Sequence, residues 1–143
     1  MIAPPPVKPQ RSGSASNGAR MRVASLILSF RYAFAGVRYF LWTQRNAKIH
    51  SAIGLAAIGA GVALGIDRYE WLALLVTITI VIAAEGVNTA LEAVVDLVSP
   101  EYHTLAKIAK DVGAGTVLIT AIASVIIGMV LFLPHLLPLI IRR

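Results

Sequence analysis

Three stretches of the chain are apolar for long enough to be candidate membrane-spanning helices. The first covers about residues 49 to 66 and the third about residues 112 to 133, where it ends before two prolines. The second covers about residues 71 to 96; only its first half is uncharged, so the helix must continue through Glu85 to reach the roughly 17 to 25 residues that a span needs. The pattern predicts an all-α integral membrane protein with three transmembrane helices.

A fourth apolar pattern precedes these spans, over about residues 21 to 43. Apolar residues recur there at helical spacing from Leu26 to Leu41, while Arg31 and Arg38 lie a heptad apart on another face. This arrangement, with tyrosine and tryptophan beside it, is typical of an amphipathic helix that lies in the headgroup plane. We expect an N-terminal surface helix; the alternative is a core helix of a soluble protein with two surface arginines.

The two ends of the chain are expected to be tails. Residues 1 to 20 hold four of the seven prolines and have no apolar periodicity, which predicts a disordered cytoplasmic tail; residues 134 to 143 are expected to form a C-terminal tail. All eight Lys and Arg before residue 49 lie on the amino side of the first span, with no acid among them. The positive-inside rule therefore predicts a cytoplasmic N-terminus and a cytoplasmic connection over residues 97 to 111.

Composition supports the membrane assignment and narrows the chemistry. The chain is 57% hydrophobic and 14% charged, whereas soluble domains are about 45 to 50% apolar and about 25% charged. It has no cysteine, which excludes disulfides, thiolate metal sites and a cysteine nucleophile. The sequence contains no Walker-type loop, protein-kinase glycine loop, Ser-His-Asp order or zinc spacing, and no nucleic-acid partner is expected.

The second span carries a polar stripe. Its members are three, four and four residues apart, which places them on one helix face: Glu85, Asn88, Glu92 and Asp96. Counted from Glu70 at about 1.5 Å per residue, Glu85 lies about 22 Å and Glu92 about 33 Å along a hydrocarbon layer about 30 Å thick. A carboxylate at such depth costs roughly 2.5 to 3.5 kcal/mol. It therefore indicates a general base, a cation ligand or a proton relay; the alternative is a stripe of helix–helix hydrogen bonds.

The two acids suit different tasks. The poorly solvated carboxylate of Glu85 suits a base that takes a proton from an alcohol, whereas Glu92, nearer water, suits a hard divalent cation.

In the second connection, over residues 97 to 111, Ser99 and Pro100 predict the N-cap and first position of a new helix. That helix would present a mostly basic face able to hold phosphate, formed by His103, Lys107, Lys110 and Asp111. The alternative is a basic anchor for the third span.

These observations leave two other functional classes open. A small proton- or cation-coupled membrane transporter could use Glu85 alternately from both sides, but the acids lie toward one interface and the connection is basic. A structural membrane scaffold would explain the spans and leave the polar stripe without a purpose.

The strings E-G-V-N-T-A-L-E-A-V-V-D (85 to 96), S-P-E-Y-H (99 to 103) and A-K-I-A-K-D (106 to 111) closely resemble the small prokaryotic membrane diacylglycerol kinases and undecaprenol kinases. The likeness covers about residues 21 to 133, and R-N-A-K-I-H (45 to 50) is more similar to the undecaprenol kinase branch. The resemblance implies a homotrimer in the bacterial inner membrane. It also implies an ATP-dependent lipid kinase that uses Mg²⁺ to phosphorylate diacylglycerol or undecaprenol at the cytoplasmic interface.

The resemblance also implies roles for individual residues. Glu85 would be the catalytic base on the lipid hydroxyl, Asn88 would orient it or the phosphates, and Glu92 would bind magnesium. Contacts with the nucleotide, its phosphates and its sugar are implied for a larger set: Tyr32, Glu101, Tyr102, His103, Lys110 and Asp111. Arg38 would contact the lipid or phosphate.

One position departs from the family pattern. Gln44 stands where many members have a second metal-binding glutamate, just before the R-N-x-x-I-H stretch. Its amide oxygen can still bind a cation, but it brings less charge. We expect Glu92 and the ATP phosphates to supply most metal ligands, with Gln44 acting directly or through water.

Overall fold

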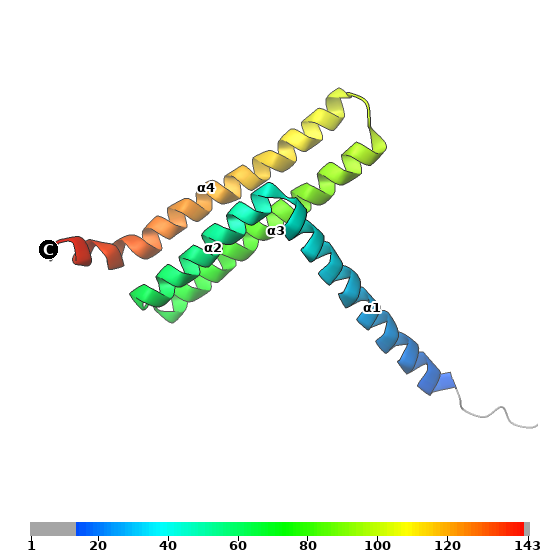
Figure 1. Ribbon diagram of the computed structural model, residues 1–143, viewed down its shortest axis with the longest axis horizontal. Helices are drawn as coiled ribbons and strands as arrows, with labels where there is room; N and C mark the ends of the chain where they lie inside the picture. Colours follow the sequence, from blue (N-terminus) through cyan, green and yellow to red (C-terminus); the bar gives the residue numbers. More distant parts are fainter. Residues whose placement is uncertain (1–13, 142–143) are drawn as a thin grey trace, which may run out of the picture. The chain divides into compact units, whose positions relative to one another are not determined.

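The computed structural model describes residues 14 to 141, and this part of the chain forms four helices (Figure 1). They are α1 (Ser14–Thr43), α2 (Arg45–Leu64), α3 (Arg68–Val98) and α4 (Thr104–Ile141). The last three are long and apolar enough to cross a membrane. The structure thus confirms the predicted all-α class with three candidate spans and a preceding N-terminal helix.

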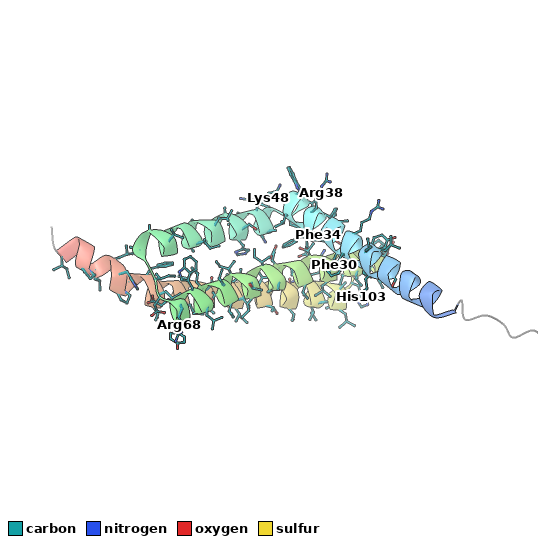
Figure 2. All side chains as sticks on the ribbon, turned by 90° about the horizontal axis from the view of Figure 1, so that it is seen from below. Phe30, Phe34, Arg38, Lys48, Arg68 and His103 are labelled. Carbon is teal, nitrogen blue, oxygen red and sulfur yellow. The ribbon has the colours of Figure 1, made fainter. Side chains whose placement is uncertain are left out.

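The chain divides into two compact units, Met1–Arg38 and Tyr39–Arg143, which we describe separately. The first unit holds most of α1, which begins at Ser14, ahead of the expected start at residue 21. The rest of the predicted tail, residues 1 to 13, lies outside the described residues. Phe30 and Phe34 on α1 are 65% and 72% exposed, so this helix presents a large apolar surface (Figure 2). Its position in the headgroup plane stays a prediction.

In the second unit, α2, α3 and α4 run side by side, and α3 packs antiparallel on α4 along much of its length (Figure 1). At about 1.5 Å per residue, α2 is about 30 Å long, α3 about 46 Å and α4 about 57 Å. The hydrocarbon layer is about 30 Å thick, so α3 and α4 are long enough to extend beyond it. Arg68, the first residue of α3, and His103, just before α4, lie at opposite ends of α3 (Figure 2).

The turn between α2 and α3 is closed by capping and close packing. Gly65 ends α2 with φ 67°, a left-handed conformation that costs glycine little, and its N–H donates to the Gly61 carbonyl over 3.0 Å. Gly61 allows close contact between the helices, because a Cβ there would lie 3.2 Å from Trp71. Asp67 and Glu70 form a reciprocal capping box that starts α3.

The connection between α3 and α4 differs from the expectation. Ser99 does not cap a new helix; it ends α3, with its N–H donating to the Val95 carbonyl over 2.8 Å, and α4 begins only at Thr104. The reason is Pro100, which disfavours helical geometry in the residue before it. His103 contributes to the start of α4, because its Nδ1 accepts the Leu105 N–H over 3.2 Å.

The far end of α4 also differs from the expectation. The helix does not stop at Pro134: Pro134 and Pro138 both lie within it, and it continues to Ile141. Proline removes one helical hydrogen bond, but helices in membranes tolerate it where neighbouring groups satisfy the freed carbonyls. Nearby, the His135 ring packs back on its own helix, with Nδ1 3.1 Å from the Leu131 carbonyl oxygen.

Candidate active site

A cavity of about 330 Å³ lies where the three helices of the second unit meet, and we call it the polar cavity. Helix α3 supplies its charged wall. The lining residues come from α2, α3 and α4: Asn46, Ile49, His50, Glu85, Asn88, Glu92, Ala114, Val117, Leu118 and Ala121. The spacing along α3 brings three of the four stripe residues, Glu85, Asn88 and Glu92, to one wall, as the sequence predicts.

The deeper stripe residues are almost completely buried. Glu85 is 3% exposed and Asn88 is 6% exposed. Glu85 Oε2 and Asn88 Oδ1 are both buried without a hydrogen-bond partner in the described structure. Leaving a buried polar atom unpaired costs roughly 1 to 3 kcal/mol, more for a charged group, so such atoms are expected to meet a ligand.

Asn88 links the two acids of the stripe. Its Nδ2 donates to Glu92 Oε1 over 3.1 Å. The bond satisfies one face of the amide and turns the free Oδ1 away from Glu92. Glu92 is partly exposed, whereas Glu85 is buried among the helices; their depths in the membrane stay predictions.

A second cavity of about 440 Å³ lies at the α3–α4 connection, and we call it the connection cavity. It brings together residues from the end of α3, the connection and the first turns of α4: Val95, Asp96, Ser99, Pro100, Glu101, Tyr102, His103, Ala106, Lys107, Lys110 and Asp111. Glu92 and Asp96 are one turn apart, so the two cavities follow each other along α3.

Two ion pairs organise the connection cavity. Lys110 Nζ donates to Asp96 Oδ1 over 2.8 Å and so joins α4 to α3. Lys107 pairs with Asp111 one turn along α4. The two lysines and two carboxylates are all solvent-accessible, so the pairs can open and the lysines can donate to another anion.

The structure gathers most of the predicted site residues into these two cavities. Glu85, Asn88 and Glu92 line the polar cavity, and five others line the connection cavity: Glu101, Tyr102, His103, Lys110 and Asp111. Of the residues described, Gln44 lines neither cavity; it is the N-cap of α2 and makes no side-chain cap bond. Tyr32 and Arg38 belong to the first unit, and their roles stay predictions.

The sequence interpretation missed the polar lining residues of α2, because Asn46 and His50 line the polar cavity together with Glu85. Asp96 and Lys107, which the sequence placed in the polar stripe and the basic face, hold the ion pairs of the connection cavity. The R-N-A-K-I-H stretch contains Asn46 and His50 at i and i+4, which places them on one helix face and could have indicated them.

A third cavity, of about 230 Å³, continues from His50 toward the opposite end of the bundle, and we call it the apolar cavity. It shares His50 with the polar cavity. Its other lining residues are almost all apolar: Ile53, Gly54, Ala57, Leu74, Thr77, Ile78, Val81, Ile82, Ser124, Val125, Ile127, Gly128 and Phe132. A polar and an apolar compartment therefore adjoin in the same three-helix bundle.

Helix α3 offers oxygen donors to the polar cavity. Over the described residues, no group of three or more His, Cys, Asp or Glu is gathered as a metal site. Mg²⁺ is usually bound by one or two carboxylates together with water and substrate phosphates. Glu92, with the unpartnered oxygen of Glu85 in the same cavity, fits that type of site.

The chain is similar to known lipid kinases. The prokaryotic diacylglycerol kinase family matches residues 31 to 132. The chain is 46% identical to a diacylglycerol kinase from Synechocystis over 96% of this chain and 79% of the relative. It is 38% identical to an undecaprenol kinase from Bacillus subtilis over 76% of this chain and 88% of the relative, and 31% identical to a diacylglycerol kinase from Escherichia coli over 77% and 90%. The chain belongs to the prokaryotic diacylglycerol kinase family and is a membrane lipid kinase.

Proposed function

We propose that the protein transfers the γ-phosphate of ATP to the hydroxyl of a lipid alcohol, diacylglycerol or undecaprenol, at the cytoplasmic face of the bacterial inner membrane. One observation carries the proposal: a buried glutamate with an unpartnered oxygen, Glu85, lies in a cavity open to a second carboxylate, Glu92. Phosphoryl transfer needs an aligned acceptor, removal of its proton and neutralisation of phosphate charge, and two such acids can serve the last two needs.

Glu85 is the base in this proposal. Its Oε2 has no hydrogen-bond partner among residues 14 to 141 and is available to accept the proton of a lipid hydroxyl. Glu92 would hold Mg²⁺ against the phosphates, and Asn88, which donates to Glu92, would keep that carboxylate in one orientation. The ion would supply charge neutralisation when bound.

The connection cavity is the proposed nucleotide site. Lys110 would exchange its bond to Asp96 for a phosphate oxygen, and Asp111 would contact the sugar. Glu101, Tyr102 and His103 would contact the rest of the nucleotide from the connection. This position keeps ATP in water while the transferred phosphate approaches Glu85 along α3.

Three further residues enter on the strength of the family resemblance. Tyr32 would border the nucleotide and Arg38 would contact the lipid or phosphate. Gln44 would bind Mg²⁺ directly or through water, and it would add less charge than the glutamate that many relatives carry.

The apolar cavity supports a lipid as the acceptor. From Glu85 to Leu74 on α3 is about 16 Å at 1.5 Å per residue, which is long enough for the first part of an acyl or polyprenyl chain. A hydroxyl at Glu85 could thus be joined to a chain that follows this cavity. The same chemistry suits both diacylglycerol and undecaprenol.

We also propose that the N-terminus is cytoplasmic and that the protein works as a homotrimer. The basic residues ahead of α2 support the orientation through the positive-inside rule. The many exposed apolar side chains on α2, α3 and α4 are consistent with lipid and neighbouring subunits covering them.

The direct test uses purified full-length protein in mixed micelles with γ-labelled ATP and Mg²⁺. Diacylglycerol, undecaprenol and a short prenol are offered in parallel, and the labelled product is separated by extraction into organic solvent. Label in a lipid product supports the proposal and identifies the preferred acceptor. Label released only as inorganic phosphate, with each lipid present at saturation, refutes it.

A further inference from the structure

Helix α4 lies very close to α3 at Gly113, directly beside the polar stripe. A Cβ added at Gly113 would overlap Asn88 Oδ1 and would lie 3.0 Å from Leu91 Cδ2. Real Cβ atoms essentially never approach other atoms so closely, so a larger residue requires the Asn88 amide or the helix to move. Gly113 is itself buried.

The side chain that would have to move is the one that links the acids. Asn88 is 6% exposed, and its Nδ2 donates to Glu92 Oε1 over 3.1 Å. A rotation of the amide away from Gly113 changes the direction of that bond and moves Oδ1 within the polar cavity. The bare backbone at Gly113 thus forms the wall against which the Asn88 amide rests.

We propose that Gly113 is a positioning residue for phosphoryl transfer: its missing side chain fixes the Asn88 amide, and through it the Glu92 carboxylate. The inference rests on the proposed role of Glu92. Gly113 touches neither substrate nor nucleotide in this account. Its effect passes from α4 to Asn88 by close packing and from Asn88 to Glu92 by a hydrogen bond.

The alternative explanation is plain helix packing, and the structure supplies a matched control. Gly115 lies on the same helix, and a Cβ there meets nothing within 4 Å. Alanine stabilises a helix interior relative to glycine, so Gly115→Ala keeps full activity and an equal or higher melting temperature. Gly113→Ala carries the same chemical change at the place where α4 meets Asn88.

The test is a double-mutant cycle on the full-length protein, measured as kcat and as the Mg²⁺ concentration that half-saturates binding of a non-hydrolysable ATP analogue. A misplacement of about 1 Å can cost on the order of 10²-fold in rate, so we expect such a fall in kcat for Gly113→Ala and for Asn88→Ala. Loss of an orienting partner weakens metal binding by about 10- to 100-fold, which sets the expected rise in the Mg²⁺ requirement.

The double variant Asn88→Ala with Gly113→Ala decides the mechanism. If Gly113 acts through Asn88, the double variant is no slower than Asn88→Ala alone; independent effects multiply to about 10⁴-fold and overturn the proposal. Adding Leu91→Ala to Gly113→Ala removes only the contact with Leu91. Restored activity in that variant assigns the loss to Leu91 packing and also overturns the proposal.

Folding failure is informative in this design. If Gly113→Ala does not fold, the double variant with Asn88→Ala has room for the new methyl group and is expected to fold; failure of both contradicts the overlap with Asn88. An Asn88→Ala variant with normal kcat and normal Mg²⁺ dependence counts against the proposed site. If Asn88→Ala is impaired while Gly113→Ala is fully active, the positioning role of Gly113 is refuted and the proposed site is not.

Discussion

Glu85→Gln separates the chemistry of the site from its shape. Glutamine has nearly the volume of glutamate, so the side chain fits a position that is only 3% exposed. It cannot accept a proton from the lipid hydroxyl. Because Glu85 Oε2 has no protein partner, the substitution breaks no hydrogen bond of that oxygen, although the new amide N–H group is buried in its place.

The size of the effect follows from the role of the base. A general base contributes about 10²- to 10⁴-fold, and at about 1.36 kcal/mol per tenfold this corresponds to roughly 2.7 to 5.4 kcal/mol of transition-state stabilisation. Burial keeps bulk water from replacing the missing base, which favours the upper part of that range. An unpaired buried amide costs about 1 to 3 kcal/mol of folding free energy, so the two effects are measured separately.

The assay compares initial rates of lipid phosphorylation at saturating ATP, Mg²⁺ and lipid, with a melting curve for each preparation. We expect Glu85→Gln to lose kcat while KM for ATP stays unchanged, because the nucleotide is held elsewhere. Glu70→Gln is the matched control: Glu70 starts the same helix at its other end, and an amide oxygen can still accept the Asp67 N–H. A folded Glu85→Gln protein whose kcat is within about threefold of the wild type refutes the assignment of the base.

Three other predictions test separate parts of the structure. Glu92→Gln raises the Mg²⁺ concentration for half-maximal rate by about 10- to 100-fold, and excess Mg²⁺ recovers much of the rate; unchanged Mg²⁺ dependence contradicts a metal-binding role. Gln44→Glu lowers the Mg²⁺ requirement if position 44 takes part in metal binding, and Gln44→Ala with unaltered dependence shows that it does not. Gly61→Ala lowers the free energy of unfolding by about 1 to 2 kcal/mol, because a Cβ there lies 2.9 Å from Ile66 and 3.2 Å from Trp71. Gly59→Ala raises the free energy of unfolding by about 0.5 to 1 kcal/mol, because a Cβ there meets nothing within 4 Å. Denaturation followed by circular dichroism measures both, and equal effects at the two glycines contradict the packing.

The sequence predicted best those features that lie within a single helix. The stripe residues Glu85, Asn88 and Glu92 lie on one face because of helical periodicity alone. The three spans were likewise indicated by length and apolarity alone. These features are local, so no knowledge of helix packing was needed.

Contacts between helices could not be predicted in this way. The pairing of Lys110 with Asp96 depends on how far α3 and α4 are offset along each other, and that offset is set by packing at positions such as Gly113. The predicted start of α4 was wrong for a related reason. Ser99 and Pro100 are residue types that often begin a helix, but here Ser99 ends α3 and α4 begins only at Thr104. Asn46 and His50 were missed because their relevance depends on the packing of α2 against α3.

The connection cavity is built from a single hairpin, between Val95 and Asp111, whereas the polar cavity needs three helices. Contacts between residues close in sequence form early, because little chain entropy is lost in closing a short loop. The proposed nucleotide site can therefore form once α3 and α4 pair. The polar cavity also needs the hairpin of α2 and α3, so a chain that has formed only one of its two hairpins lacks the chamber around Glu85.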